Sequence, residues 1–263
     1  MNIIITAGGT TEQIDQVRRI ANAASGRLAS CVAREFVRQG GKKIEKIFYV
    51  CERSAIVPEL DCLEVITTRG TESVGDALSY ILTNEKIDAV IHSMAVSDYT
   101  VESMTTAEDL GDCIAQRIWN RKEEFSDEAA LADFVTDCIL KNDRVIDRSN
   151  KVGSNIPHPL LALKQTPKLI GMIKSLQPET ILVGFKLLDG VPRQELLDVA
   201  HILLKKNACD FVLANDLSEI HGEQHIAYLL APDRHYIRCE TKQEIAETIV
   251  SNVLGLYGKR KRK

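Results

Sequence analysis

Three short segments rich in small and polar residues could together form a ligand site. They are Gly8–Thr10, Ser93–Tyr99 and Ala214–Asp216, and each follows an apolar run that is typical of a buried strand. The carboxyl ends of parallel strands meet at one edge of a sheet, where α/β proteins bind their ligands. Glycines also let backbone N–H groups approach an anion closely. The three segments therefore predict a binding crevice, and the glycine turn suits an anionic ligand.

Three further side chains could supply chemistry. Arg18 could bind a carboxylate or a phosphate, and Asn22 could orient an amine or a carbonyl group. Lys151 lies between small and polar residues, which suits a phosphate clamp or the stabilisation of charge in a transition state. Each also has a plainer interpretation, because Arg18 and Asn22 precede a predicted helix and Lys151 can be an ordinary surface lysine.

Strand-like and helix-like segments alternate along most of the chain. The predicted strands cover residues 2–7, 44–50, 63–67, 89–94, 181–185 and 210–215, and the predicted helices cover 25–39, with Ser25 as the cap, 71–82, 193–206 and 242–256. This alternation predicts an α/β fold with a doubly wound, mostly parallel, Rossmann-like sheet and helices on both faces. Residues 105–145 predict a helical insertion, and residues 227–239 predict a late β-hairpin. We expect one domain over residues 1–257 and a disordered basic tail over 258–263.

The composition limits the class of protein. The 263 residues carry a net charge of −4, and five cations lie in the tail, so the rest of the chain has a charge of −9. This argues against a nucleic-acid partner. No apolar run reaches the roughly 18 residues of a membrane span, and the first residues lack the pattern of a signal peptide. The seven scattered cysteines contain no C-x-x-C pair, which predicts reduced thiols in a cytoplasmic protein.

The order of the motifs resembles one known family. The motifs are Ala7–Glu12, Ile14-Asp15, Val17-Arg18, Asn22, Ser25-Gly26, His92–Tyr99, Asn150–Val152, Lys164–Lys168, Gly184–Leu187 and Ala214–Asp216. In this order and spacing, the chain resembles the phosphopantothenate–cysteine ligases (phosphopantothenoylcysteine synthetases) of coenzyme A biosynthesis, in their stand-alone bacterial form. The resemblance covers nearly the whole chain.

The resemblance implies a two-step ligation. A nucleoside triphosphate with Mg²⁺ activates the carboxylate of 4′-phosphopantothenate as an acyl-nucleotide and releases pyrophosphate. The amine of L-cysteine then displaces the nucleoside monophosphate and forms an amide. CTP is the favoured triphosphate, and ATP is the alternative because Gly184–Leu187 also resembles the ATP-using form. The family further implies a homodimer with composite active sites.

The resemblance also assigns roles to matching residues. Lys151 corresponds to the catalytic lysine of the activation step, Asn22 to the catalytic asparagine of the reaction with cysteine, and Asp98 to an acid near the metal and the triphosphate. The nucleotide-binding positions are Gly8, Gly9, Thr10, Ser97, Asp98, Phe185, Lys186, Asn215 and Asp216. The substrate-binding positions are Arg18, Ser25, Gly26, Met94, Ala95, Val96 and Lys168.

Two other classes of function compete with this interpretation. The first is a Rossmann-like NAD(P) oxidoreductase, which the absence of the fingerprint G-x-G-x-x-G disfavours. The P-loop motif G-x-x-x-x-G-K-[ST] is absent as well, which disfavours a P-loop NTPase. The second is a non-catalytic nucleotide-binding protein, which has no need of Asn22, Asp98 and Lys151 together. Pyrophosphate release that requires both phosphopantothenate and a triphosphate separates the ligase from both alternatives.

Overall fold

The computed structural model describes residues 1–121, 124–222 and 224–262. These residues form two compact units where the sequence predicted one domain. The first unit consists of Met1–Thr11, Ala21–Ser97 and the described residues from Pro167 onward. The second unit consists of Glu12–Ile20 and Asp98–Thr166.

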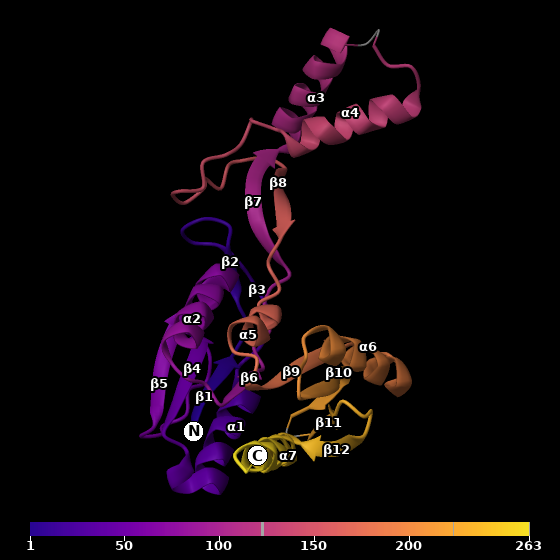
Figure 1. Ribbon diagram of the computed structural model, residues 1–263. Helices are drawn as coiled ribbons and strands as arrows, with labels where there is room; N and C mark the ends of the chain where they lie inside the picture. Colours follow the sequence, from indigo (N-terminus) through magenta and orange to yellow (C-terminus); the bar gives the residue numbers. More distant parts are fainter. Residues whose placement is uncertain (122–123, 223, 263) are drawn as a thin grey trace. The chain divides into compact units, whose positions relative to one another are not determined.

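The first unit is built on one eight-stranded sheet (Figure 1). From one edge to the other the strands are β12 (Tyr236–Thr241), β11 (Gln224–Leu230), β10 (Phe211–His221), β9 (Ile181–Leu188), β6 (Ala89–His92), β1 (Asn2–Ala7), β4 (Lys46–Glu52) and β5 (Leu63–Thr68). Within this sheet β11 runs opposite to the direction of the other strands, and it pairs antiparallel with both β10 and β12. The predicted doubly wound, mostly parallel sheet and the late hairpin of β11 and β12 are therefore confirmed.

The order of the strands reverses between β1 and β6. The chain passes from β1 outward to β4 and β5, returns to β6 on the other side of β1, and continues to β9 and β10. The register pairs Thr6 of β1 with His92 of β6, so both strands end at the same level. A reversal of this kind is a topological switch point, where open α/β sheets form their ligand crevice.

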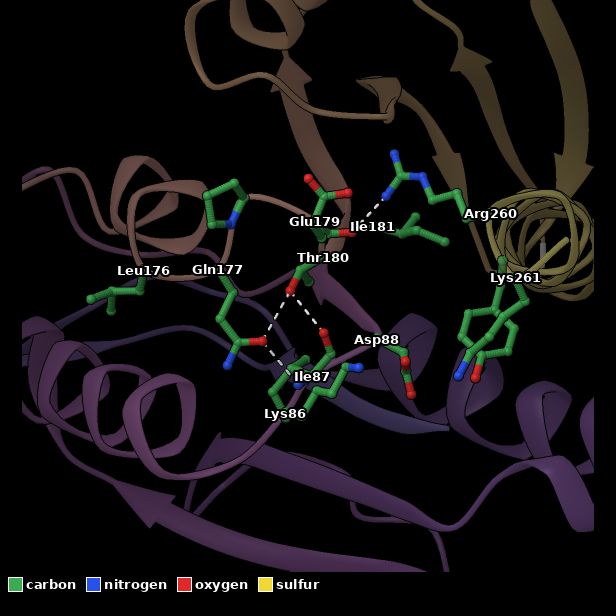
Figure 2. A pocket seen from close by; sticks show the side chains of 12 residues that line it. Lys86, Ile87, Asp88, Leu176, Gln177, Glu179, Thr180, Ile181, Arg260 and Lys261 are labelled. Carbon is green, nitrogen blue, oxygen red and sulfur yellow. Dashed lines mark hydrogen bonds between the residues drawn. The ribbon is translucent and has the colours of Figure 1, made fainter. Parts of the chain in front are cut away.

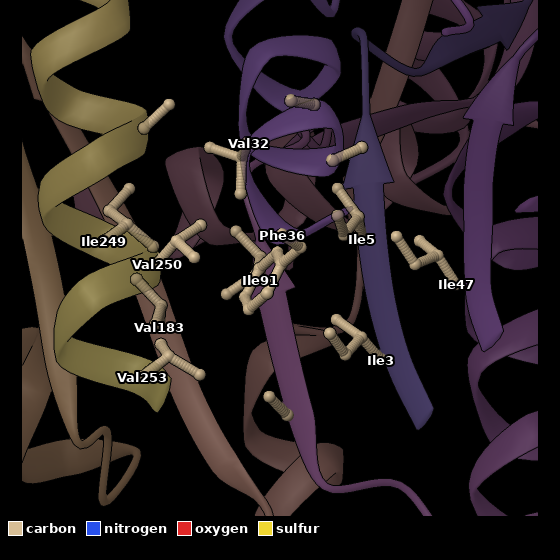
Figure 3. Close-up of a cluster of buried hydrophobic side chains, with 14 of the residues drawn as sticks. Ile3, Ile5, Val32, Phe36, Ile47, Ile91, Val183, Ile249, Val250 and Val253 are labelled. Atoms are coloured by element: carbon tan, nitrogen blue, oxygen red, sulfur yellow. The ribbon is translucent and has the colours of Figure 1, made fainter. Parts of the chain in front are cut away.

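Helices cover both faces of the sheet. One face carries α1 (Arg27–Gly40) and α7 (Lys242–Arg260), and the other carries α2 (Gly70–Asn84), α5 (Ile170–Leu176) and α6 (Arg193–Lys206). A short 3₁₀ turn, Gly41–Lys43, follows α1. Figure 3 shows side chains of α1, α7 and the strands converging in the first of these two cores.

The aliphatic core explains why the helices form where the sequence predicted them. Val32 and Phe36 are one turn apart on α1 and are completely buried, as are Ile249 and Val253 on α7. Each such side chain contributes roughly 1.5–3 kcal/mol when it leaves water. The two helices therefore fix one face of β1 and β6, and with it the positions of the loops that follow these strands.

The second unit contains a helical hairpin on a two-stranded ribbon. The ribbon consists of β7 (Tyr99–Thr106) and β8 (Pro159–Gln165), which pair antiparallel. The helices α3 (Ala107–Arg121) and α4 (Glu128–Leu140) account for the predicted helical insertion. The ribbon was not predicted. Two more short strands, β2 (Thr11–Gln13) and β3 (Arg19–Ala21), also pair with each other.

Two predictions at helix ends are wrong. The residue before α1 is Gly26 rather than Ser25, and its φ of 73° suits glycine. The Ser25 hydroxyl oxygen accepts only a long contact of 3.4 Å from the Arg27 N–H. Near the C-terminus of the chain, α7 continues past Gly258 to Arg260, so the predicted disordered tail is helical at its start. The guanidinium of Arg260 pairs with Asp210.

Lys263, the last residue of the predicted tail, lies outside the described residues. No helix in the described part of the chain has both the length and the apolarity needed to cross a membrane.

Candidate active site

The two predicted segments at the switch point are joined by backbone hydrogen bonds. The Thr10 N–H donates to the Ala95 carbonyl at 3.1 Å, and the Ala95 N–H donates to the Gly8 carbonyl at 2.9 Å. The Thr10 hydroxyl oxygen accepts the Ser97 N–H at 2.8 Å. The glycine turn after β1 and the segment after β6 therefore form one continuous surface at the carboxyl edge of the sheet.

Asn22 lies against this surface. Its backbone N–H donates to the Thr10 carbonyl at 3.1 Å, and its side-chain Nδ2 donates to the Ala95 carbonyl at 3.0 Å. A Cβ at Gly9 would lie 2.1 Å from the Asn22 carbonyl oxygen, which no side chain could tolerate. Gly9 is therefore glycine because the Asn22 backbone packs against it, and this close approach places the carboxamide beside Ala95.

The remaining glycines of the site bring the start of α1 to the same edge. Gly8 and Gly26 have φ values of 83° and 73°, a conformation that other residues rarely adopt. A Cβ at Gly26 would lie 3.1 Å from the Gly8 backbone nitrogen. Ser25 is exposed beside them, and its carbonyl accepts the Ile56 N–H at 2.9 Å. The substrate-binding positions predicted at Ser25 and Gly26 thus lie beside the glycine turn that follows β1.

A polar cluster at the ends of β1 and β6 was not predicted. The Thr6 hydroxyl oxygen accepts the Met94 N–H at 3.1 Å and lies 3.2 Å from Nδ1 of His92. The Ser93 hydroxyl donates to the Thr6 carbonyl at 2.6 Å. Burial lowers the pKa of His92 to about 4, so its ring is neutral at physiological pH. The sequence feature that could have indicated this cluster is the threonine and the histidine at the ends of two otherwise apolar strands.

The ends of β9 and β10 lie further along the same edge. Phe185 packs against the core under α1 and α7, so strand alternation places Lys186 on the opposite face of β9. No ion pair or hydrogen bond within the described residues involves the Lys186 ammonium group. On β10, Asn215 pairs in register with Leu187 and is buried.

The Asp216 side chain is hydrogen-bonded to the loop after β9 and to Ser218 of its own strand. Its carboxylate accepts the N–H groups of Gly190, Val191 and Ser218 at 2.8–2.9 Å, and the Ser218 hydroxyl at 2.6 Å. The bond from the Ser218 hydroxyl and the three backbone bonds hold the pKa of Asp216 well below its usual range. This carboxylate therefore fixes the loop after β9 relative to β10, and most of its accepting capacity is used in doing so.

Lys168 is the other predicted cation of the first unit. It is exposed, and its carbonyl accepts the Gly171 N–H at 3.4 Å just before α5. Its backbone therefore lies beside the start of α5.

In the second unit, Arg18 and Asp15 hold the loop that carries Lys151. Asp15 is buried and accepts two hydrogen bonds from the Arg18 guanidinium at 2.5 and 3.0 Å, and it also accepts the Val152 N–H at 3.0 Å. Arg18 donates to the Val152 carbonyl at 2.9 Å. The guanidinium of Arg18 and the backbone N–H groups of Arg18, Val17 and Val152 donate to the Asp15 carboxylate and hold its pKa well below its usual range. Arg18, predicted to bind a substrate anion, thus already binds a carboxylate of its own unit.

Lys151 itself is exposed, and within the described residues its ammonium group has no hydrogen-bond or ion-pair partner. Asp98 is exposed as well, and its carbonyl accepts the Thr166 N–H at 3.0 Å. No group of three or more potential metal ligands from His, Cys, Asp or Glu occurs within the part of the chain that the structure describes. A single carboxylate fits Mg²⁺ that is carried mainly by the phosphates of a nucleotide.

A cavity of about 420 Å³ lies at the opposite, amino edge of the sheet (Figure 2). It is lined by the residues before β6 and β9 and by the end of α7, among them Lys86, Gln177 and Lys261. The Thr180 hydroxyl donates to the Ile87 carbonyl at 2.8 Å, and Gln177 accepts the Ile87 N–H at 2.9 Å. Because ligands of parallel sheets bind at the carboxyl edge, this cavity is separate from the candidate active site.

Comparisons with known proteins identify the family of this chain. The family model "DNA/pantothenate metabolism flavoprotein C-terminal domain" matches residues 1–107 and 101–256. The chain belongs to this family. The resemblance to the phosphopantothenate–cysteine ligases is therefore confirmed at the level of the family.

Individual relatives cover nearly the whole chain. The coenzyme A biosynthesis bifunctional protein CoaBC of Thermococcus kodakarensis is 26% identical over 248 residues, which are 94% of this chain and 49% of that protein. The protein of the same name from Methanocaldococcus jannaschii is 26% identical over 253 residues, 95% of this chain and 50% of that protein. The chain thus spans about half the length of these curated relatives.

Solved structures share the fold. The DNA/pantothenate metabolism flavoprotein from Streptococcus pneumoniae has a TM-score of 0.76 and 29% identity, and the match covers 97% of this chain and 99% of that one. The Cab2 mutant H337A, in complex with phosphopantothenate-cysteine, has a TM-score of 0.65 and 15% identity, over 98% of this chain and 86% of that one. At 15% identity the second likeness shows the fold alone.

Proposed function

We propose that this chain is a phosphopantothenate–cysteine ligase. It joins the carboxylate of 4′-phosphopantothenate to the amine of L-cysteine by way of an acyl-nucleotide. Membership of the family and the names of the relatives support the pathway. The ligand in the Cab2 complex, a protein of the same fold, supports the class of product.

The observation that carries the proposal is the position of Asn22 at the switch point. Its Nδ2 is engaged by the Ala95 carbonyl, so the carboxamide is held in one orientation. No partner within the described residues reaches its Oδ1, and this oxygen can accept an N–H from an incoming amine. A carboxamide has no proton to exchange near neutral pH, so Asn22 orients the amine of cysteine and does not act as its base.

The first step needs positive charge where the triphosphate is attacked. A substrate carboxylate oxygen attacks the α-phosphorus, the bond to the β-phosphate oxygen breaks, and pyrophosphate leaves with the electron pair. Lys151 and Lys186 are ammonium groups without partners within the described residues, and we assign to them the stabilisation of this charge. Bound Mg²⁺ supplies further charge neutralisation on the phosphates, and Asp98 is the residue of this chain that would hold it.

The nucleotide base is proposed to stack on Phe185 near Asn215. Phe185 is half-buried at the carboxyl edge, which leaves part of its ring for a base to cover. The buried carboxamide of Asn215 lies one strand away on β10 and can donate and accept hydrogen bonds. CTP is the proposed triphosphate, and turnover with CTP compared with ATP at equal concentration tests this choice.

Gly9 also distinguishes the ligase from a dinucleotide-dependent oxidoreductase. In the dinucleotide fingerprint, a glycine leaves space for the pyrophosphate to approach the backbone. Here the backbone of Asn22 fills the space beside Gly9. We therefore expect no binding of NAD or NADP, which a fluorescence titration with the reduced cofactors would check.

We further propose a homodimer with composite sites, as the family resemblance implies. Inactive Lys151→Ala chains mixed with inactive Asn22→Ala chains should then regain part of the activity, because one site of a mixed dimer can contain both intact residues. A monomer in sedimentation at the concentration of the assay, with full activity, would contradict the proposal.

The direct test of the ligase function is pyrophosphate release. Purified protein is incubated with 4′-phosphopantothenate, L-cysteine, Mg²⁺ and CTP or ATP, and each component is omitted in turn. We expect pyrophosphate only when the triphosphate and phosphopantothenate are both present, and the amide product only when cysteine is added. Pyrophosphate release without phosphopantothenate, or no release at all, would refute the proposed function.

A further inference from the structure

His92 has one ring nitrogen that is committed to the fold and one that is not. The Thr6 hydroxyl oxygen accepts the Met94 N–H, so its own hydrogen is free to be donated to Nδ1 of His92. When the Thr6 hydroxyl donates to Nδ1, the single proton of the neutral ring is on Nε2. In this tautomer His92 is an N–H donor at Nε2.

Nε2 of His92 has no hydrogen-bond acceptor among the residues that the structure describes. No described residue lies within hydrogen-bonding distance of Nε2. Both ring nitrogens of His225 are completely enclosed and unpaired, whereas Nε2 of His92 is not completely enclosed, so a ligand can reach it. His92 is only 8% exposed, and leaving an N–H unpaired in such a place is costly unless a ligand or water accepts it.

The strand register shows which face of the sheet His92 occupies. Val90, two residues earlier on β6, and Met94, two residues beyond His92, both belong to the core under α2, α5 and α6. His92 pairs with Gly184 of β9, and Lys186 lies two residues further toward the carboxyl edge on the same face. Two hydrogen-bond donors, one neutral and one cationic, are therefore diagonal neighbours at this end of β6 and β9.

We infer that His92 is a substrate-binding residue that donates Nε2–H to a phosphoryl oxygen of the nucleoside triphosphate. The inference rests on the proposed function. Nε2–H of His92 and the Lys186 ammonium group both lack an acceptor among the described residues, and such donors favour binding of an anionic oxygen. In open α/β sheets, ligands bind at the edge where the switch point lies. A neutral donor adds a hydrogen bond without adding another positive charge, and it stays a donor across the physiological pH range.

The test uses three variants that remove different parts of the ring. His92→Asn places an amide near Nδ1, which preserves the bond to Thr6 but removes the donor at Nε2. His92→Gln places an amide N–H near the Nε2 position. His92→Leu removes both. Circular dichroism and thermal unfolding establish that each variant is folded before binding is measured.

Binding of CTP, ATP and inorganic tripolyphosphate is measured by calorimetry. Loss of a hydrogen bond to a charged oxygen should weaken binding of the triphosphates roughly ten- to hundredfold in His92→Asn and His92→Leu. His92→Gln should stay within a few-fold of wild type. Tripolyphosphate has no base, so the same loss with this probe assigns the contact to a phosphoryl oxygen. In wild-type protein, the ¹⁵N and ¹H resonances of Nε2–H should shift when any of the three ligands is added.

The outcomes separate the inference from the proposed function. Wild-type ligase activity with unchanged triphosphate affinity in His92→Asn overturns the role of His92 and leaves the function standing. Triphosphate binding that depends on His92, without any amide product, overturns the function and leaves the binding role standing. A wild-type protein that binds none of the three probes overturns both.

Discussion

The substitution Gly9→Ala tests whether the backbone contact with Asn22 builds the active site. The new Cβ would lie 2.1 Å from the Asn22 carbonyl oxygen and 2.9 Å from its carbonyl carbon. The first distance is about 1.3 Å short of ordinary van der Waals contact at 3.4 Å. Both atoms belong to the backbone, so no side-chain rotation can relieve the overlap, and the segment around Asn22 must move by about 1 Å.

Such a movement disturbs two hydrogen bonds of Asn22, to the Thr10 and Ala95 carbonyls. A displacement of about 1 Å in a positioned group can lower a catalysed rate by about a hundredfold. Overpacking of this kind also costs typically 1–3 kcal/mol of stability. We therefore expect Gly9→Ala to fold, to unfold at a lower temperature, and to form the amide product about a hundredfold more slowly.

The matched control is Gly255→Ala in the interior of α7. Apart from the adjoining backbone of α7, no described heavy atom lies within 4 Å of a Cβ at this position, and alanine is favoured over glycine in a helix by up to about 1 kcal/mol. This variant should retain full activity and equal or higher stability. The rate of amide formation and the thermal midpoint are measured for both variants. A Gly9→Ala protein with wild-type rate and midpoint would show that the contact does not position Asn22.

Three other predictions concern single side chains. Lys151→Ala should abolish pyrophosphate release without changing the thermal midpoint, because the side chain is exposed; unchanged release would contradict its role. Asn22→Ala should still form the acyl-nucleotide and release one equivalent of pyrophosphate in a single turnover, but amide formation should be about 10²–10³ times slower; loss of both steps together would reduce Asn22 to a structural role. Asp15→Asn should destabilise the Lys151 loop at neutral pH, measured by proteolysis of the loop. The pKa of Asp15 is lowered in the folded protein, so its stabilising effect is present above the unfolded pKa of about 4 and is lost as the pH falls further. The stabilities of wild type and Asp15→Asn should therefore converge in acid. A difference between the two proteins that grows on acidification would contradict this.

The central strands could be predicted because their burial leaves a strong pattern. Asn2–Ala7 and Arg193–Lys206 have the predicted bounds, since a continuous β-branched run and a clear helical period each define one element. By contrast, every residue of β8 is exposed, although the strand includes Leu160, Leu161 and Leu163. Such a strand shows neither alternation nor burial, and its pairing with β7 depends on residues about 60 positions away.

The site could be predicted in its parts but not in its contacts. Small and polar residues after β1 and β6 indicated the carboxyl edge of the sheet, and the structure joins Gly8–Thr10 to Ala95 there. No pattern in the sequence indicates that the Asn22 backbone packs against Gly9, because that contact depends on how the chain returns to β1. The pairing of Arg18 with Asp15 was missed for a simpler reason: an arginine that could bind a substrate anion can equally bind a carboxylate three residues away.

The most direct test of the ligase mechanism follows oxygen from the substrate carboxylate. Phosphopantothenate labelled with ¹⁸O in its carboxylate is turned over with CTP, Mg²⁺ and L-cysteine, and the nucleotide and phosphate products are analysed by mass spectrometry. Activation as an acyl-nucleotide predicts one ¹⁸O atom in the nucleoside monophosphate and none in the pyrophosphate. Label in inorganic phosphate, or amide formation without transfer of label to the monophosphate, would contradict the mechanism proposed for this protein.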